Sequence, residues 1–143
     1  MKIVLSYLVG MIFLLLNIAV SAADHTTPTA PADYLAMESS IDMDDVDDDF
    51  LKKSKRLYKS KCKKCHGMEG DGQGSAAEDI EIKPTAFNVE GYMAGKKDGQ
   101  LFWIIKNGSE GTEMEAFGPD SDAGISEEKL WELIAYMRSN FTK

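Results

Sequence analysis

Cysteine and histidine are scarce in this sequence of 143 residues, which contains two of each. The cysteines are Cys62 and Cys65, only three positions apart, so no further pair remains to build the disulfide framework of a small secreted domain. A structural zinc site needs four ligands and usually draws on a second Cys or His pair. One histidine, His66, follows the cysteines directly, but the other, His25, lies far upstream. The composition therefore disfavours both a disulfide scaffold and structural zinc.

The same residues form the pattern Cys-x-x-Cys-His, which is typical of covalent attachment of a c-type haem. Residues at i and i+3 lie on one face of a helical turn, so the thiols of Cys62 and Cys65 can both bond one porphyrin. His66 can then lie beneath the iron as the proximal axial ligand. A redox-active dithiol would instead follow a strand in a βαβ unit, whereas a lysine-rich helix is expected here. The sequence thus predicts one haem c per chain.

Residues 1–23 are typical of a signal peptide. Lys2 precedes an apolar run at residues 3–20, and small residues for cleavage follow at 20–23. This pattern predicts export to the periplasm. The run of 18 residues also reaches the lower limit for a membrane span, so a retained anchor facing the periplasm is the alternative. Contact with a membrane is expected only in that second case.

Residues 24–49 form an acidic leader that holds nine Asp or Glu residues and no Lys or Arg. Such a run repels itself, so we expect the leader to be disordered, although Ile41, Met43 and Val46 would allow a docked segment. The next stretch is basic: residues 52–64 contain eight Lys or Arg and no acid. We expect redox partner proteins with an acidic docking patch to face Lys52–Lys64, and no nucleic-acid partner.

The hydrophobic periodicity predicts an all-α domain over residues 50–143, with about three main helices. A first amphipathic helix is expected to begin near Phe50 and to run into the haem motif. A second is expected from Asp98 to Lys106, stopped by Asn107-Gly108, and a last one follows Ser126 as its N-cap. Residues 67–97 are expected to be mostly a loop around the haem edge, with Pro84 and Phe87 as lining residues.

The second axial ligand is predicted to be a methionine. Met68 is too close to His66 to reach the opposite face of a haem, and Met137 belongs to the apolar stripe of the last helix. Met114 lies in an irregular segment between two core helices, where its sulfur can be presented without breaking a helix. We predict Met114 as the distal ligand, with Met93 as the alternative; His/Met ligation raises the reduction potential.

Residues 50–143 resemble the class I monohaem c-type cytochromes. The resemblance rests on Cys62-Lys63-Lys64-Cys65-His66-Gly67, on the segment Leu101-Phe102-Trp103-Ile104-Ile105-Lys106-Asn107-Gly108, on the methionine segment, and on Trp131, Ile134 and Tyr136 of the closing helix. It implies crossed N- and C-terminal helices, a haem in a crevice, and one-electron transfer in respiration rather than enzymatic catalysis. Glu115 stands where the family commonly has a proline after the ligand methionine.

Two other functions remain open from the sequence. The chain could be a membrane-anchored haem subunit of a respiratory complex, if residues 3–20 are retained. A haem enzyme or gas sensor would require an open distal site. After residue 66, Arg138 is the only Arg or His, which disfavours peroxidase chemistry.

Overall fold

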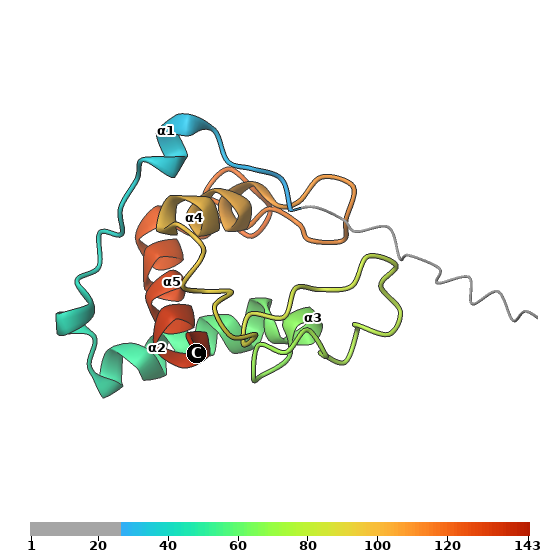
Figure 1. Ribbon diagram of the computed structural model, residues 1–143, viewed down its shortest axis with the longest axis horizontal. Coiled ribbons are helices and arrows are strands. Elements are labelled where there is room, and N and C mark those ends of the chain that lie inside the picture. Colours follow the sequence, from blue (N-terminus) through green and yellow to red (C-terminus); the bar gives the residue numbers. More distant parts are fainter. Residues whose placement is uncertain (1–26) are drawn as a thin grey trace, which may run out of the picture.

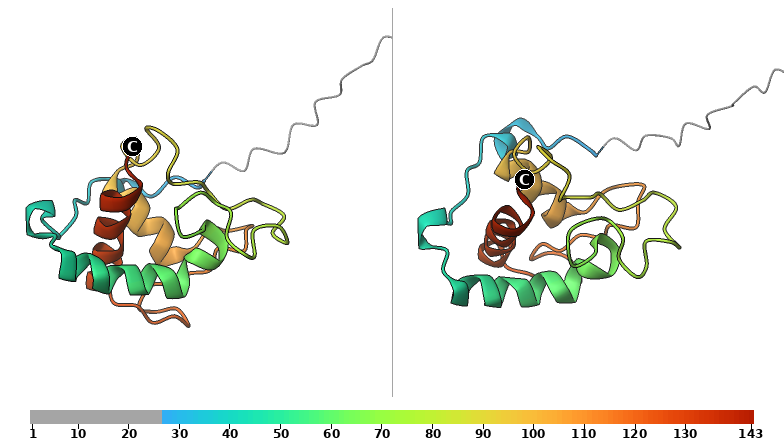
Figure 2. Two further views of the ribbon diagram at one scale, coloured as in Figure 1. Left: turned by 90° about the horizontal axis from the view of Figure 1, so that it is seen from below. Right: turned by 60° about the horizontal axis from the view of Figure 1, so that its bottom comes forward.

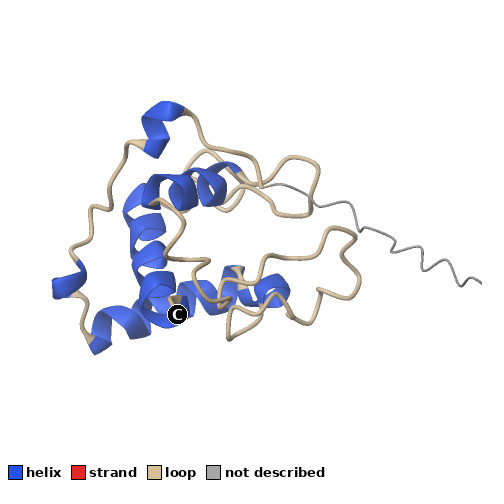
Figure 3. Cartoon of the chain, viewed as in Figure 1, coloured by secondary structure: helices blue, strands red, loops and turns tan. Residues whose placement is uncertain are grey.

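The computed structural model describes residues 27–143, and within this range every regular element is a helix (Figure 3). The predicted signal peptide and His25 lie outside the described residues. Three helices are long: α2 (Asp48–Lys61), α4 (Asp98–Asn107) and α5 (Glu127–Phe141). Three are short: α1 (Ala32–Leu35), the 3₁₀ turn η1 (Met43–Asp45) and α3 (Lys63–His66). The all-α prediction with three main helices is confirmed.

Local capping explains where the long helices begin. The Asp47 side chain accepts a hydrogen bond of 2.8 Å from the amide of Phe50, so α2 begins at Asp48, two residues before the predicted start. Ser126 caps α5 as predicted, accepting from the Lys129 amide at 3.4 Å. Gly108, with φ of 77°, ends α4 after Asn107.

The core forms where α5 crosses α2 and packs on α4 (Figures 1 and 2). Tyr58 of α2 is fully buried, and its ring lies 5.4 Å from that of Tyr136 and 5.2 Å from that of Phe141. On the other side of α5, Trp131 stacks on Phe102 of α4 at 4.3 Å between ring centroids. Because aromatic rings bury large apolar areas, these contacts fix the crossing of the helices.

The leader packs on α4 at its first described end. Its first described part, residues 27–37, which we call the strap, contains α1 and packs along α4 (Figure 1). The Gln100 side chain accepts from the Ala30 amide at 2.8 Å and donates to the Pro28 carbonyl at 2.9 Å. Tyr34 stacks on Phe102 with ring centroids 6.2 Å apart. These polar and aromatic contacts lie at the non-acidic end of the leader, and disorder of its acidic part stays a prediction.

Residues 38–49, which we call the acidic run, follow the strap and lead through η1 into the start of α2. Its carboxylates cap backbone amides: Asp42 accepts from the Asp44 amide at 3.0 Å, and Asp47 caps α2. None of the three ion pairs in residues 27–143 involves a leader carboxylate. Because the acidic run leads into the first turn of α2 and the cysteines follow its last turn, the two lie at opposite ends of this helix.

Candidate haem-binding site

The junction of α2 and α3 brings Cys62 and Cys65 onto one turn. Cys62 ends α2, and its carbonyl accepts from the amides of Cys65 at 3.2 Å and His66 at 2.9 Å. Both cysteines are free thiols and half-buried. Gly67 then turns the chain away with φ of 76°, a conformation that suits glycine. The predicted spacing of two thiols and one imidazole on a single turn is thus present.

The His66 ring is oriented by a backbone carbonyl. Its Nδ1 lies 3.0 Å from the carbonyl oxygen of Thr85, which can only accept, so Nδ1 carries the proton and donates. This tautomer leaves the lone pair of Nε2 for a metal, and such a hydrogen bond fixes both the ring and its basicity. The Phe87 ring stacks on the imidazole at 4.4 Å, so Phe87 lies beside the ligand as predicted.

Burial controls the protonation of these groups. Desolvation lowers the pKa of His66, and the hydrogen bond to Thr85 offsets part of that effect. The imidazole is thereby kept neutral, which is the form that binds a metal. Burial, with a smaller contribution from Cys65, raises the pKa of the Cys62 thiol to about 12. Without haem, this thiol stays protonated near neutral pH and is a weak nucleophile.

Met114 lies in the segment between α4 and α5, half-buried against the hydrophobic core. Backbone hydrogen bonds hold this segment, although Glu115 replaces the proline common in the family. The Met114 carbonyl accepts from the Ser109 amide at 2.9 Å, and the Phe117 amide donates to the Ile105 carbonyl at 3.0 Å. In Figure 1 this segment and α3 extend to the same side of α5.

Met93, the alternative ligand, has a different environment. Its side chain is 1% exposed and belongs to the hydrophobic core. Its carbonyl accepts a hydrogen bond from the Arg138 guanidinium, which also binds the carbonyl of Lys96 and the carboxylate of Asp98. Arg138 thus ties residues 93–98 to α5. The assignment of Met114 over Met93 stays a prediction.

Three contributors to this region were missed from the sequence. The Thr85 carbonyl is a backbone group, so no side chain in the sequence indicates its role. Its position after Pro84 is the one feature of the sequence that points to it. Arg138 was considered only as a catalytic group, whereas its contacts with the loop carbonyls are structural. Gln100 had no local signal, since its partners lie about 70 residues upstream.

The basic residues of α2 and α3 up to Lys64 are all exposed. They are Lys52, Lys53, Lys55, Arg56, Lys59, Lys61, Lys63 and Lys64. None of them forms an ion pair with another residue of the described chain. Lys63 and Lys64 lie between the two cysteines, so this basic face borders the haem-attachment turn. We call these eight residues the basic face.

The donor set fits a haem. Two reduced thiols share a turn, one imidazole has its Nδ1 occupied and its Nε2 available, and a thioether lies in a separate segment. Together with crossed terminal helices, this arrangement defines a c-type cytochrome, a protein that carries covalently bound haem c.

Residues 50–137 match the family described as cytochrome C oxidase, cbb3-type, subunit III, and the chain belongs to that family. It is 30% identical to cytochrome c-554(547) of Halothiobacillus neapolitanus over 83 residues, which cover 58% of this chain and 88% of the relative.

Two solved structures have a similar arrangement. One is the Kuenenia stuttgartiensis reducing HAO-like protein complex Kustc0457/Kustc0458, at 26% identity and a TM-score of 0.56; the match covers 72% of this chain and 50% of that one. This chain therefore spans half the length of that relative. The other is cytochrome cL of Methylophaga aminisulfidivorans, at 21% identity and a TM-score of 0.49, covering 67% of this chain and 58% of that one. The family match begins at residue 50, so the strap lies outside it.

Proposed function

We propose that this protein is an exported one-electron carrier whose haem iron is ligated by His66 and Met114, serving respiratory electron transfer in the periplasm. The haem supplies exchange between ferric and ferrous iron, while the protein supplies ligands, burial and a docking surface. The observation that carries this proposal is the His66 imidazole fixed by Thr85 beside the two thiols. A neutral imidazole paired with a thioether fills both axial positions and leaves none for a substrate.

An optical and redox titration of the matured protein tests the proposal. We expect a single one-electron transition and no reaction of the ferrous protein with carbon monoxide. Rapid carbon monoxide binding would favour a haem enzyme or gas sensor with an open distal position.

Localisation is proposed from the sequence of residues 1–23. Among residues 27–143, no helix has the length and apolar character needed to cross a membrane. Fractionation of cells that express the full chain distinguishes the two possibilities: the cleaved form is recovered with periplasmic proteins, and a form retaining residues 3–20 is recovered with membranes. Recovery only from membranes would favour an anchored subunit of a respiratory complex over a periplasmic carrier.

The basic face is proposed to dock an acidic patch on the electron-transfer partner. Eight exposed cations on α2 and α3, with no ion pair to any residue of 27–143, leave their charge available for a partner and would speed encounter at low ionic strength. Replacing Lys59 and Lys63 by Gln should slow electron exchange with an acidic partner at low salt, and the difference should vanish when salt screens it. Replacing Lys129, a base on α5, is the matched control. Equal rates of electron exchange for the wild type and the double variant at low salt would show that the partner does not dock on the basic face.

A further inference from the structure

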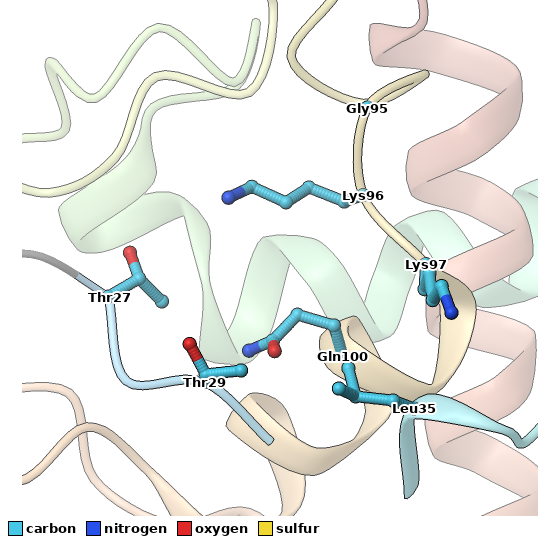
Figure 4. Close-up of a pocket in the computed structure, with 7 residues that line it drawn as sticks. All are labelled: Thr27, Thr29, Leu35, Gly95, Lys96, Lys97 and Gln100. Atoms are coloured by element: carbon cyan, nitrogen blue, oxygen red, sulfur yellow. The ribbon is translucent and has the colours of Figure 1, made fainter. Parts of the chain in front are cut away.

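A pocket of about 210 Å³ lies between the strap and the segment that leads into α4 (Figure 4). Thr27, Thr29 and Leu35 line it from the strap, and Gly95, Lys96, Lys97 and Gln100 line it from the other side. Figure 4 shows the Lys96 side chain extending toward the two threonines, whereas Lys97 points away. The Gln100 amide is already occupied by Pro28 and Ala30. Of the two lysines that line the pocket, Lys96 is the one whose ammonium extends into it.

A row of aromatic rings connects Lys96 to the haem ligand. The Lys96 ammonium lies 5.0 Å from the centroid of the Tyr92 ring, which lies 6.4 Å from that of Phe87. Phe87 in turn stacks on His66 at 4.4 Å. Two aromatic rings, Tyr92 and Phe87, thus separate the Lys96 ammonium from the His66 imidazole. A haem bound at His66 extends well beyond its iron, and its two propionate carboxylates lie on one edge of the macrocycle.

The backbone that carries Lys96 is held firmly. Arg138 binds the carbonyls of Met93 and Lys96, and its ion pair with Asp98 measures 2.6 Å. Lys96 itself forms no ion pair in the described chain. The other charged residue that lines the pocket is Lys97, and the Asp98–Arg138 ion pair follows it at the start of α4. Since Asp98 is neutralised by Arg138, the ammonium of Lys96 gives the pocket a positive character.

We propose that this pocket seats a propionate carboxylate of the haem, with the Lys96 ammonium as its charge partner and the strap as its outer wall. A carboxylate withdrawn from bulk water needs a hydrogen-bonded counter-charge, which Lys96 supplies, and the hydroxyls of Thr27 and Thr29 offer further donors. The strap lies outside the family match, which begins at residue 50. The inference rests on the bound haem and is independent of the electron-transfer partner.

The reduction potential of the matured protein, measured against pH, tests the proposal. Replacing Lys96 by Gln leaves the carboxylate charge uncompensated, which favours ferric iron and lowers the potential. It also raises the pH at which the carboxylate loses its proton, so the pH-dependent fall of the potential should begin at higher pH. Lys96→Arg should restore the wild-type curve. Lys97→Gln is the matched control, and because the Lys97 side chain points away from the threonines it should shift the potential and its pH dependence less than Lys96→Gln does.

A second variant tests the role of the strap. Thr27→Val and Thr29→Val together remove the two hydroxyls without touching the contacts of Gln100, and we expect a smaller shift in the same direction. Haem staining of the denatured protein confirms for every variant that the cofactor is attached, which separates this proposal from the haem-site assignment. Identical curves for Lys96→Gln and Lys97→Gln would overturn the proposal and leave the pocket as a solvent-filled surface hollow.

Discussion

The backbone of Gly99 and the carbonyl of Tyr34 are packed so closely that any side chain at residue 99 would overlap the carbonyl oxygen. Gly99 is buried in the first turn of α4, and Tyr34 belongs to α1 of the strap. We expect Gly99→Ala to displace the strap and to lower the free energy of unfolding by about 1–3 kcal/mol, the usual cost of overpacking. Urea unfolding measures the loss.

The control for that substitution is Gly95→Ala. A Cβ at residue 95 would approach the Gly91 carbonyl oxygen no closer than 3.2 Å, and Gly95 does not have a positive φ. We therefore expect a smaller loss of stability. Equal losses for the two variants would show that the strap contributes little to stability.

Covalent attachment depends on both thiols. Cys62→Ala together with Cys65→Ala removes the two sulfur atoms that form thioether bonds, so the denatured double variant should show no haem after acid extraction and gel electrophoresis. Each single variant should retain one bond. Haem that persists in the denatured double variant would contradict the assignment of these cysteines.

Met114→Ala should remove the weak red absorption band of Met-ligated ferric haem. The potential should fall, because loss of a thioether ligand disfavours ferrous iron, and carbon monoxide should bind the ferrous protein. Met93→Leu is the control, since leucine preserves most of the volume at this buried position. If Met93→Leu opens the iron and Met114→Ala does not, Met93 is the ligand.

Glu115 follows the predicted ligand and is exposed. A carboxylate near the iron stabilises the ferric state, which carries one more positive charge, although water and salt weaken the effect. Glu115→Gln should therefore raise the reduction potential modestly, most visibly at low ionic strength. A fall in potential, or no change at low salt, would show that this carboxylate is too far from the iron.

Ser54 offers a test of packing between α2 and α5. Its side chain is 1% exposed, and its hydroxyl has no hydrogen-bond partner within the described chain. Ser54→Ala should increase the free energy of unfolding by about 1 kcal/mol, because an unsatisfied buried hydroxyl is removed and alanine favours the helix. Ser60→Ala, on the exposed side of the same helix, should change stability little. Destabilisation by Ser54→Ala would show that the hydroxyl has a partner in solution.

Local signals in the sequence were sufficient for the helices and for the haem motif. Ser126 marks the start of α5 through a short-range hydrogen bond, and Gly108 marks the end of α4 through its backbone geometry. Cys62 to His66 occupy a single turn. The all-α fold followed from periodicity, which reports burial along one helix at a time. The boundary of α2 shifted by two residues because Asp47, one of several adjacent aspartates, acts as the cap.

The strap and the orientation of His66 could not be predicted in the same way. The amino-acid composition describes the leader as one acidic segment. It gives no sign that Pro28, Ala30 and Tyr34 pack on α4. The Thr85 carbonyl has no side-chain signature, and its distance from His66 depends on the path of residues 67–85. Both features arise from contacts between distant parts of the chain.

The hydrogen bond between Pro28 and Gln100 joins residues 72 positions apart, and the haem-attachment residues lie between them in the chain. During synthesis from the N-terminus, the strap is made before the cysteines, and α4 only afterwards. Closing so long a loop is slow and depends on the enclosed structure being formed. We therefore expect the strap to dock late in folding, after the segment with Cys62 and Cys65 has been made.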